Sequence, residues 1–121
     1  MKRDMELVRR ILLQLEERLE FDEPHVPNVD GYSDNEIYYH LKLMSEAGLI
    51  DAKNWSDDSG PYWVTTSMTA AGHDFIDAAR SDTLWQKAQS IVTKSGGALT
   101  LEALKIGLSM AVKNAITGGV S

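Results

Sequence analysis

The chain has 121 residues, of which 43% are hydrophobic, and a formal net charge of -6 at pH 7. This length fits one domain, or one domain with a terminal extension, and the composition is that of a globular protein. The sequence contains no cysteine, which excludes disulfide scaffolds, thiol catalysis and cysteine zinc sites. The charged N-terminus lacks the apolar stretch of a signal peptide, so we expect a cytoplasmic protein.

The negative charge is concentrated in the middle of the chain. Residues 33–80 carry eight acidic and three basic side chains, whereas residues 81–121 carry two acidic and four basic ones. Affinity for DNA comes largely from Lys and Arg side chains that displace counterions from the phosphates. Bulk charge therefore does not favour binding of nucleic acid to the central segment.

A first helix is predicted from Asp4 to Leu19, because apolar residues recur there at helical spacing. The residues of this stripe are Met5, Val8, Leu12, Leu15 and Leu19. Two prolines and a glycine then predict a loop from Phe21 to Tyr32. We expect this loop to end in a short strand near Val29, which pairs with a later hairpin.

A second helix is predicted from Ser33 to Ala47. Ser33 and Glu36 have the spacing of a capping box, in which the two side chains satisfy free N–H groups at a helix start. The apolar residues that follow form one stripe, and Gly48 can adopt the left-handed conformation that ends a helix.

Two short strands are predicted after this helix, from Ala52 to Trp55 and from Tyr62 to Thr66. A polar turn that contains glycine and proline, residues 56–61, separates them. A helix followed by a β-hairpin is the layout of a winged helix-turn-helix domain. We therefore predict a mainly α fold with a small antiparallel β-sheet.

Three more helices are predicted after the hairpin. Thr69 can cap a helix that runs to Ala79, in which Gly72 allows a neighbouring backbone to approach closely. A helix from residue 82 or 83 to about 94 ends before Gly96–Gly97, and a last one spans 99–117 and ends at Gly118–Gly119. We therefore divide the chain into a winged-helix domain, residues 1–80, and a C-terminal helical appendage, residues 81–121.

The last predicted helix is apolar over much of its surface. Three charged residues inside it argue against a transmembrane span, which needs roughly 20 apolar residues. An apolar surface of this width favours burial against the domain or association with a second copy of the chain. The residues predicted for such an oligomer interface are Leu101, Leu104, Leu108, Ala111, Val112 and Ala115.

A family resemblance rests on three blocks, residues 1–12, 39–50 and 68–80, with Trp85 shortly after. Together they resemble a family of small bacterial and prophage proteins of unknown function, over nearly the whole chain. The resemblance implies a winged-helix fold and no particular activity. The block that ends in Gly48, Leu49 and Ile50 is also similar to the end of the recognition helix in bacterial winged-helix regulators. Those regulators have a short helix where this chain has its proline-containing loop.

Candidate DNA-binding residues lie on the second helix and on the hairpin. Asn can pair with adenine and Lys can reach guanine or phosphate, so polar residues away from the apolar stripe are the candidates. These residues are Asn35, Tyr39, His40, Lys42, Lys53 and Asn54. Acidic residues on the same helix and in the turn repel phosphate, and they favour an ordinary solvated face or a protein contact instead.

Catalytic and metal-binding patterns find no support in the sequence. No Ser–His–Asp spacing, phosphate loop or dinucleotide fingerprint is present. His25 with Asp22 and Glu23 is a weak candidate for a metal site, because one histidine beside two acids is common by chance. We expect a protein that is not an enzyme and that holds neither a cofactor nor a metal ion.

Three functions remain open. The first is a DNA-binding or transcription-regulatory protein of phage or mobile-element origin, which binds duplex DNA as a homodimer or higher oligomer. The second is an acidic module that binds a host or phage protein, either as a mimic of the charge of DNA or as a partner of a regulator, which would explain the negative charge of residues 33–80. The third is a C-terminal helix that forms oligomers or binds membranes. We place DNA binding first, because the element order and the resemblance both imply a winged-helix fold, and the end of the second helix is similar to that of a recognition helix.

Overall fold

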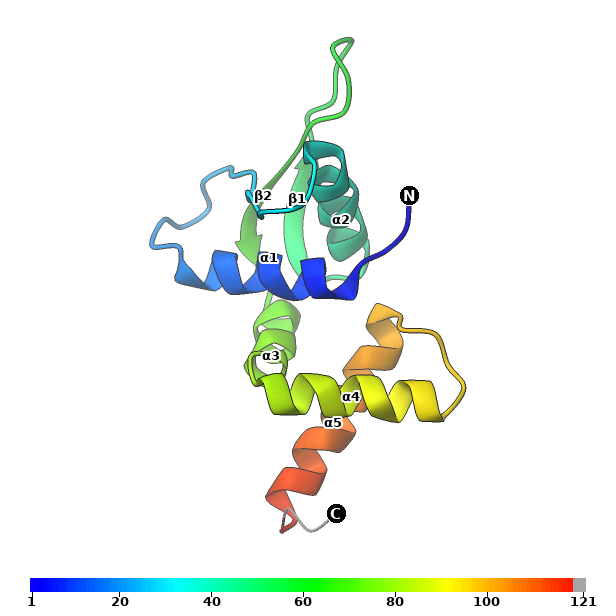
Figure 1. The fold of residues 1–121 in the computed structure, drawn as a ribbon. Helices are drawn as coiled ribbons and strands as arrows, with labels where there is room; N and C mark the ends of the chain where they lie inside the picture. The colour runs from blue at the N-terminus through cyan, green and yellow to red at the C-terminus, as the bar shows by residue number, and fades with distance from the viewer. Residues whose placement is uncertain (119–121) are drawn as a thin grey trace. The chain divides into compact units, whose positions relative to one another are not determined.

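The computed structural model describes residues 1–118 of the chain (Figure 1). It is mainly helical with one two-stranded antiparallel sheet, which confirms the predicted fold class. The elements in chain order are α1 (Met5–Glu17), α2 (Asp34–Glu46), β1 (Ile50–Asn54), β2 (Trp63–Met68), α3 (Ala70–Ala79), α4 (Asp82–Lys94) and α5 (Leu101–Ile116).

The chain forms two compact units, one from Met1 to His73 and a second that begins at Asp74. The predicted division between residues 80 and 81 stays a prediction, because a boundary by compactness need not be a boundary by function. Within residues 1–118, no helix combines the length and the apolar character that a bilayer crossing requires.

Helix α1 begins where the sequence predicts and ends earlier. The side chain of Asp4 accepts hydrogen bonds from the backbone N–H groups of Glu6 and Leu7, which caps the helix. The last helical residue is Glu17, and Arg18 is already extended. Leu19, predicted as part of the buried stripe, is 96% exposed. The prediction for Leu19 is wrong because the helix ends at Glu17, and a residue in the extended chain beyond it no longer falls on the buried face of α1.

Helix α2 follows its local signals closely. Ser33 and Glu36 form the predicted capping box, with both side chain to backbone bonds present. Gly48 has a φ of +79°, and the backbone N–H of Leu49 donates to Met44 O at 2.9 Å. This left-handed residue ends the helix and turns the chain directly into β1.

The sheet consists of β1 and β2, with a bulge between Asp51 and Ala52. A third segment pairs with β2, but it lies at His25 and not at Val29. The backbones of His25 and Thr65 exchange two hydrogen bonds, each of 2.9 Å. The predicted pairing near Val29 is therefore wrong. Val29 is buried instead, and its carbonyl closes a turn by accepting from the N–H of Tyr32.

Gly72 in α3 explains how the first unit closes beyond the hairpin. The hydroxyl of Thr69 accepts from the backbone N–H of Gly72, as the predicted cap requires, and donates to Gly48 O. A Cβ at Gly72 would overlap the carbonyl oxygen of Leu49. The backbone of α3 thus lies directly against the end of the α2 turn, and only glycine fits there.

The second unit is held together by the packing of α4 on α5. Gly107 of α5 lies so close to α4 that an added Cβ would be 2.8 Å from Ala88 O. The predicted break after α4 is confirmed, because α4 ends at Lys94 and Gly96 has a φ of +80°. Gly119, where we predicted the last helix to end, lies outside the described residues.

Candidate recognition surface

The candidate surface combines the outer face of α2 with the outer end of the hairpin, and we refer to it as the α2–hairpin surface. Helix α2 buries Ile37, His40, Leu41 and Met44 against the first unit. This burial leaves Asn35 and Lys42 exposed and Tyr39 half-buried. The hairpin contributes exposed residues on both sides of its turn, namely Lys53, Asn54, Trp55, Asp57, Asp58 and Tyr62.

His40 does not belong to this surface, although the sequence placed it among the DNA-binding candidates. Its side chain is 1% exposed. Its Nδ1 lies 2.7 Å from the carbonyl oxygen of Glu36, and its Nε2 accepts from the backbone N–H of Asp4 at 2.8 Å. Nδ1 therefore donates to the Glu36 carbonyl, and both ring nitrogens are used inside the protein.

Asp4 joins α1 to the loop before α2. One carboxylate oxygen caps α1, and the other accepts from the hydroxyl of Tyr32 at 2.7 Å. Burial alone would raise the pKa of Asp4, but the bonds from Tyr32 and from two backbone N–H groups outweigh it and lower the pKa. The same bond, together with burial, raises the pKa of Tyr32.

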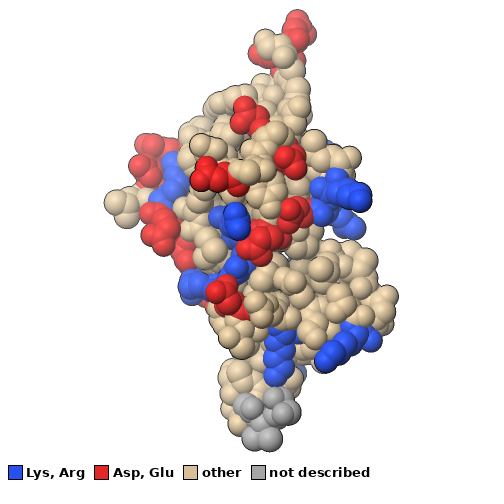
Figure 2. Space-filling view, in the orientation of Figure 1, with Lys and Arg blue, Asp and Glu red and all other residues tan. Residues whose placement is uncertain are grey.

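The first three residues form a basic arm beside α2. Because the N–H of Asp4 is bonded to His40, the chain leaves the fold next to this helix (Figure 1). Met1, Lys2 and Arg3 are all exposed, and basic side chains gather near this terminus in Figure 2. The adjacent Lys2 and Arg3 were visible in the sequence, but their position beside α2 depends on a contact 36 residues apart.

The hairpin extends well beyond the paired strands. The N–H of Trp55 donates to Tyr62 O at 2.8 Å, and Asp57 and Gly60 exchange two backbone hydrogen bonds around the turn. The ring of Tyr62 packs on that of Tyr38 in α2, with centroids 5.5 Å apart. These contacts order the projecting turn and attach its base to the helix.

The charge of the α2–hairpin surface is mainly negative. Lys42 is paired with Glu46 at 3.5 Å, so its charge is locally balanced. Lys53 is the one basic residue of segment 50–68, which also contains Asp51, Asp57 and Asp58. Acidic side chains lie at the projecting end of the hairpin in Figure 2. A phosphate backbone that approached this end would be repelled.

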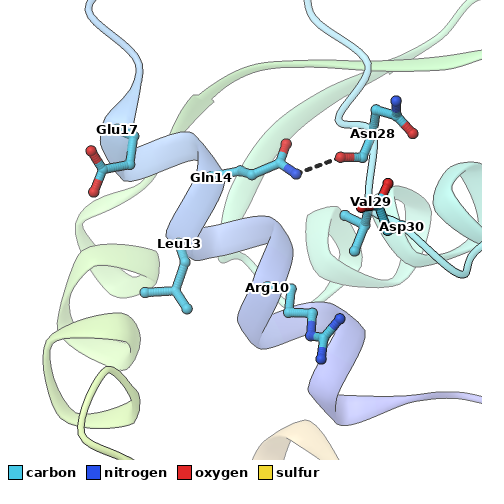
Figure 3. A pocket seen from close by; sticks show the side chains of 7 residues that line it. All are labelled: Arg10, Leu13, Gln14, Glu17, Asn28, Val29 and Asp30. Atoms are coloured by element: carbon cyan, nitrogen blue, oxygen red, sulfur yellow. Dashed lines mark hydrogen bonds between the residues drawn. The ribbon is translucent and has the colours of Figure 1, made fainter.

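A shallow groove lies between α1 and residues 28–30 (Figure 3). Gln14 donates to Asn28 O across it at 2.5 Å. Three charged side chains line it, Arg10, Glu17 and Asp30, and those of Arg10 and Glu17 point in different directions in Figure 3. Arg10 also pairs with Glu6. This groove lacks the convergent polar groups of a small-molecule site.

The residues predicted for an oligomer interface fall into three groups in the second unit. Leu104, Leu108 and Ala111 are buried within their own chain, where α5 packs on α4. They are therefore unavailable to a second copy while α4 covers them. The remaining predicted residues differ in exposure, since Leu101 and Val112 are half-buried and Ala115 is exposed. The large apolar side chains that α5 does expose are Ile106, Met110 and Ile116.

The weak metal-site candidate near His25 gains no support from the structure. Among the described residues, no group of three His, Asp or Glu side chains is placed to hold a metal ion. Burial and the nearby Arg18 lower the pKa of His25, while Glu20 opposes them. That the chain uses no metal, no cofactor and no catalytic residue stays a prediction.

Comparison with known proteins found one family model and one related protein that match the chain. A family model described as a hypothetical protein (DUF2513) matches residues 2–98, a span that contains the whole α2–hairpin surface and ends before α5. An uncharacterized protein of Haemophilus influenzae is 33% identical over 106 residues, which cover 87% of this chain and 90% of that protein. No solved structure matches the chain. The chain therefore belongs to the DUF2513 family of hypothetical proteins.

Proposed function

We propose that this protein is a regulatory accessory protein with a winged-helix domain, which binds a partner protein through the α2–hairpin surface. The observation that carries the proposal is the pairing of exposed aromatic rings with carboxylates at the hairpin. Trp55 is 49% exposed and Tyr62 is 43% exposed, and Asp57 and Asp58 lie between them in the chain. Aromatic side chains are enriched at protein interfaces, whereas a surface that follows phosphates needs cations.

The arrangement of α2 and the hairpin supports the winged-helix part of the proposal. In this interpretation helix α2 corresponds to the recognition helix and the hairpin to the wing, and the backbone bridge between His25 and Thr65 adds one further pairing to β2. The turn at Val29 to Tyr32 stands where DNA-binding relatives of this fold have another helix. An origin in a phage or another mobile element, which the sequence resemblance implies, is part of the same proposal.

Photo-crosslinking tests this function in cells of the organism whose genome encodes the protein. A benzophenone residue is introduced at position 39 or 62, within the surface, or at position 17, an exposed site on α1 outside it. We expect the same crosslinked protein from positions 39 and 62, and not from position 17. Equal crosslinking from all three positions, or none from 39 and 62, would overturn the proposal.

Binding of duplex DNA is the second candidate, and the basic arm favours it. The bond between Asp4 and His40 fixes the point at which the basic arm leaves the fold beside α2, so Lys2 and Arg3 add two exposed positive charges near this helix. N-terminal arms of helix-based DNA-binding domains contact the groove beside the recognition helix.

An electrophoretic shift assay separates this candidate from the first. DNA binding through the arm predicts a shift at about 50 mM salt that weakens steeply by about 200 mM. It also predicts that the double substitution Lys2→Ala and Arg3→Ala removes most of the shift, whereas Lys87→Ala and Lys94→Ala, the matched control in α4, does not. No shift at low salt would reject DNA binding.

A further inference from the structure

We infer that the end of the hairpin binds an arginine or lysine side chain from a basic segment of the partner protein. This inference rests on the proposed function and specifies the chemistry of the partner. The cradle for the cation is the concave surface formed by Trp55, Asp57, Ser59, Gly60, Pro61 and Tyr62.

The cradle contains two kinds of group that attract a cation. Its volume is about 460 Å³, which exceeds the size of one guanidinium group. Trp55 and Tyr62 line it with partly exposed rings, and the faces of such rings attract a cation within about 6 Å. Asp57 lines it with a carboxylate, which can accept hydrogen bonds from a guanidinium.

The cradle is formed before any partner arrives. The hydroxyl of Ser56 accepts from the backbone N–H of Tyr62 at 3.0 Å, and Oδ1 of Asn54 accepts from the backbone N–H of Ser56 at 2.9 Å. One carboxylate oxygen of Asp57 accepts from the N–H of Ser59 at 2.8 Å, which fixes that side chain. Ordered groups lose little conformational entropy on binding, so this order favours affinity.

The charge of the neighbourhood selects a basic segment over other partners. Segment 50–68 carries three carboxylates and one ammonium group, and the first unit as a whole is acidic. Aromatic rings on a projecting hairpin also suit stacking on bases of single-stranded nucleic acid, but such platforms have basic surroundings. Here the carboxylates at the turn repel phosphates and attract arginine or lysine.

The test is an NMR titration of the full-length ¹⁵N-labelled protein. The probe is a short peptide that alternates arginine and glycine, and its control contains citrulline, which keeps the shape of arginine and lacks its charge. We expect the arginine peptide to shift the amide signals of residues 54–60 and 62 in a saturable way. We expect the citrulline peptide to leave these signals unchanged.

Two variants with equal charge change separate a local site from general attraction. Asp57→Asn with Asp58→Asn removes two carboxylates at the cradle, and Glu17→Gln with Glu23→Gln removes two exposed ones elsewhere in the first unit. We expect about fivefold weaker binding of the arginine peptide to the first variant, and to Trp55→Ala, with little change for the second.

Three results would overturn the inference. These are equal weakening in both charge variants, equal binding of the citrulline peptide, and signal changes that avoid residues 54–62. The proposed function is tested separately, because crosslinks from positions 39 and 62 without binding of the arginine peptide would leave the function standing and reject the cation cradle. Binding of the arginine peptide without crosslinks from positions 39 and 62 would reject the proposed function and leave the cation cradle standing.

Discussion

The contact of His40 with the backbone of Asp4 determines where the N-terminal residues leave the fold. Both ring nitrogens of His40 are bonded inside the protein, Nε2 to the N–H of Asp4 and Nδ1 to the carbonyl oxygen of Glu36. Local sequence patterns placed His40 among exposed polar residues, because they do not reveal a partner 36 residues away. His40 is therefore a structural residue, and the basic arm is a consequence of it.

Replacing His40 by Phe tests this role. The substitution His40→Phe keeps a ring of similar size but leaves the Asp4 N–H and the Glu36 carbonyl without their bonds. We expect the free energy of unfolding to fall by about 2 kcal/mol, measured by urea denaturation. The control Tyr39→Phe, on the half-buried neighbour, should change it by less than about 0.5 kcal/mol. Equal effects would contradict the account.

The carboxylate of Asp4 makes stability depend on pH on the acid side. Its pKa in the folded protein lies below its ordinary value of 3.8, so the charged form stabilises the fold. This contribution is fully present above the unfolded-state pKa and is lost as the pH falls through the folded-state pKa.

The substitution Asp4→Asn tests the sign of this effect. Asn still caps a helix, but its amide nitrogen cannot accept from the Tyr32 hydroxyl, so the variant loses the charge together with that bond. We expect the wild type to be the more stable of the two at pH 7, and the difference to shrink as the pH falls below about 4. Urea denaturation of both proteins at pH 7 and at a pH below about 4 measures this difference in the free energy of unfolding. A difference that stays constant or grows in acid would show that the charge of Asp4 does not matter.

At the scale of the elements, glycines and caps determine how helices meet strands. Gly48 ends α2 and Gly72 lets α3 approach the carbonyl of Leu49. Both were predicted from the sequence, as was the capping box at Ser33, because each signal is confined to a few neighbouring residues. These local signals account for most of the correct boundaries.

Two alanine substitutions test the close approach at Gly72. An added methyl group in Gly72→Ala has to displace backbone, so we expect a loss of about 3 kcal/mol in the free energy of unfolding. In Gly97→Ala the same group meets Val92 at ordinary contact distances of 3.5 Å and 3.6 Å, and we expect almost no loss. Thermal unfolding of both variants measures the contrast. A loss in Gly72→Ala as small as that in Gly97→Ala would mean that α3 can move away from Leu49 without cost.

Contacts between distant segments are what the sequence did not reveal. The loop before α2 pairs with β2 at His25 and not at Val29, because pairing depends on which segment lies beside β2 and not on local β propensity. Periodicity in α5 correctly identified an apolar stripe, but it cannot tell whether α4 or a second copy covers it. The acidic and aromatic residues of the hairpin were visible in the sequence, whereas their common concave surface was not.

At the scale of the whole molecule, the charge of -6 limits what the protein can bind. The acidic hairpin and the basic arm lie on the same unit and flank α2. The choice of partner therefore depends on which of the two contributes more to binding. If the hairpin dominates, reversal of its charge should turn a protein-binding surface into one that tolerates phosphates. The double substitution Asp57→Lys and Asp58→Lys makes this change on exposed residues of a turn.

The most direct test is the yield of the protein crosslink from position 62, compared between the wild-type turn and the turn with Asp57→Lys and Asp58→Lys. Binding of a basic partner through the hairpin predicts that the charge reversal lowers this yield by about fivefold or more, since it replaces attraction by repulsion. A yield that stays the same or rises in the charge-reversed protein would contradict the proposal that this surface recognises a basic protein.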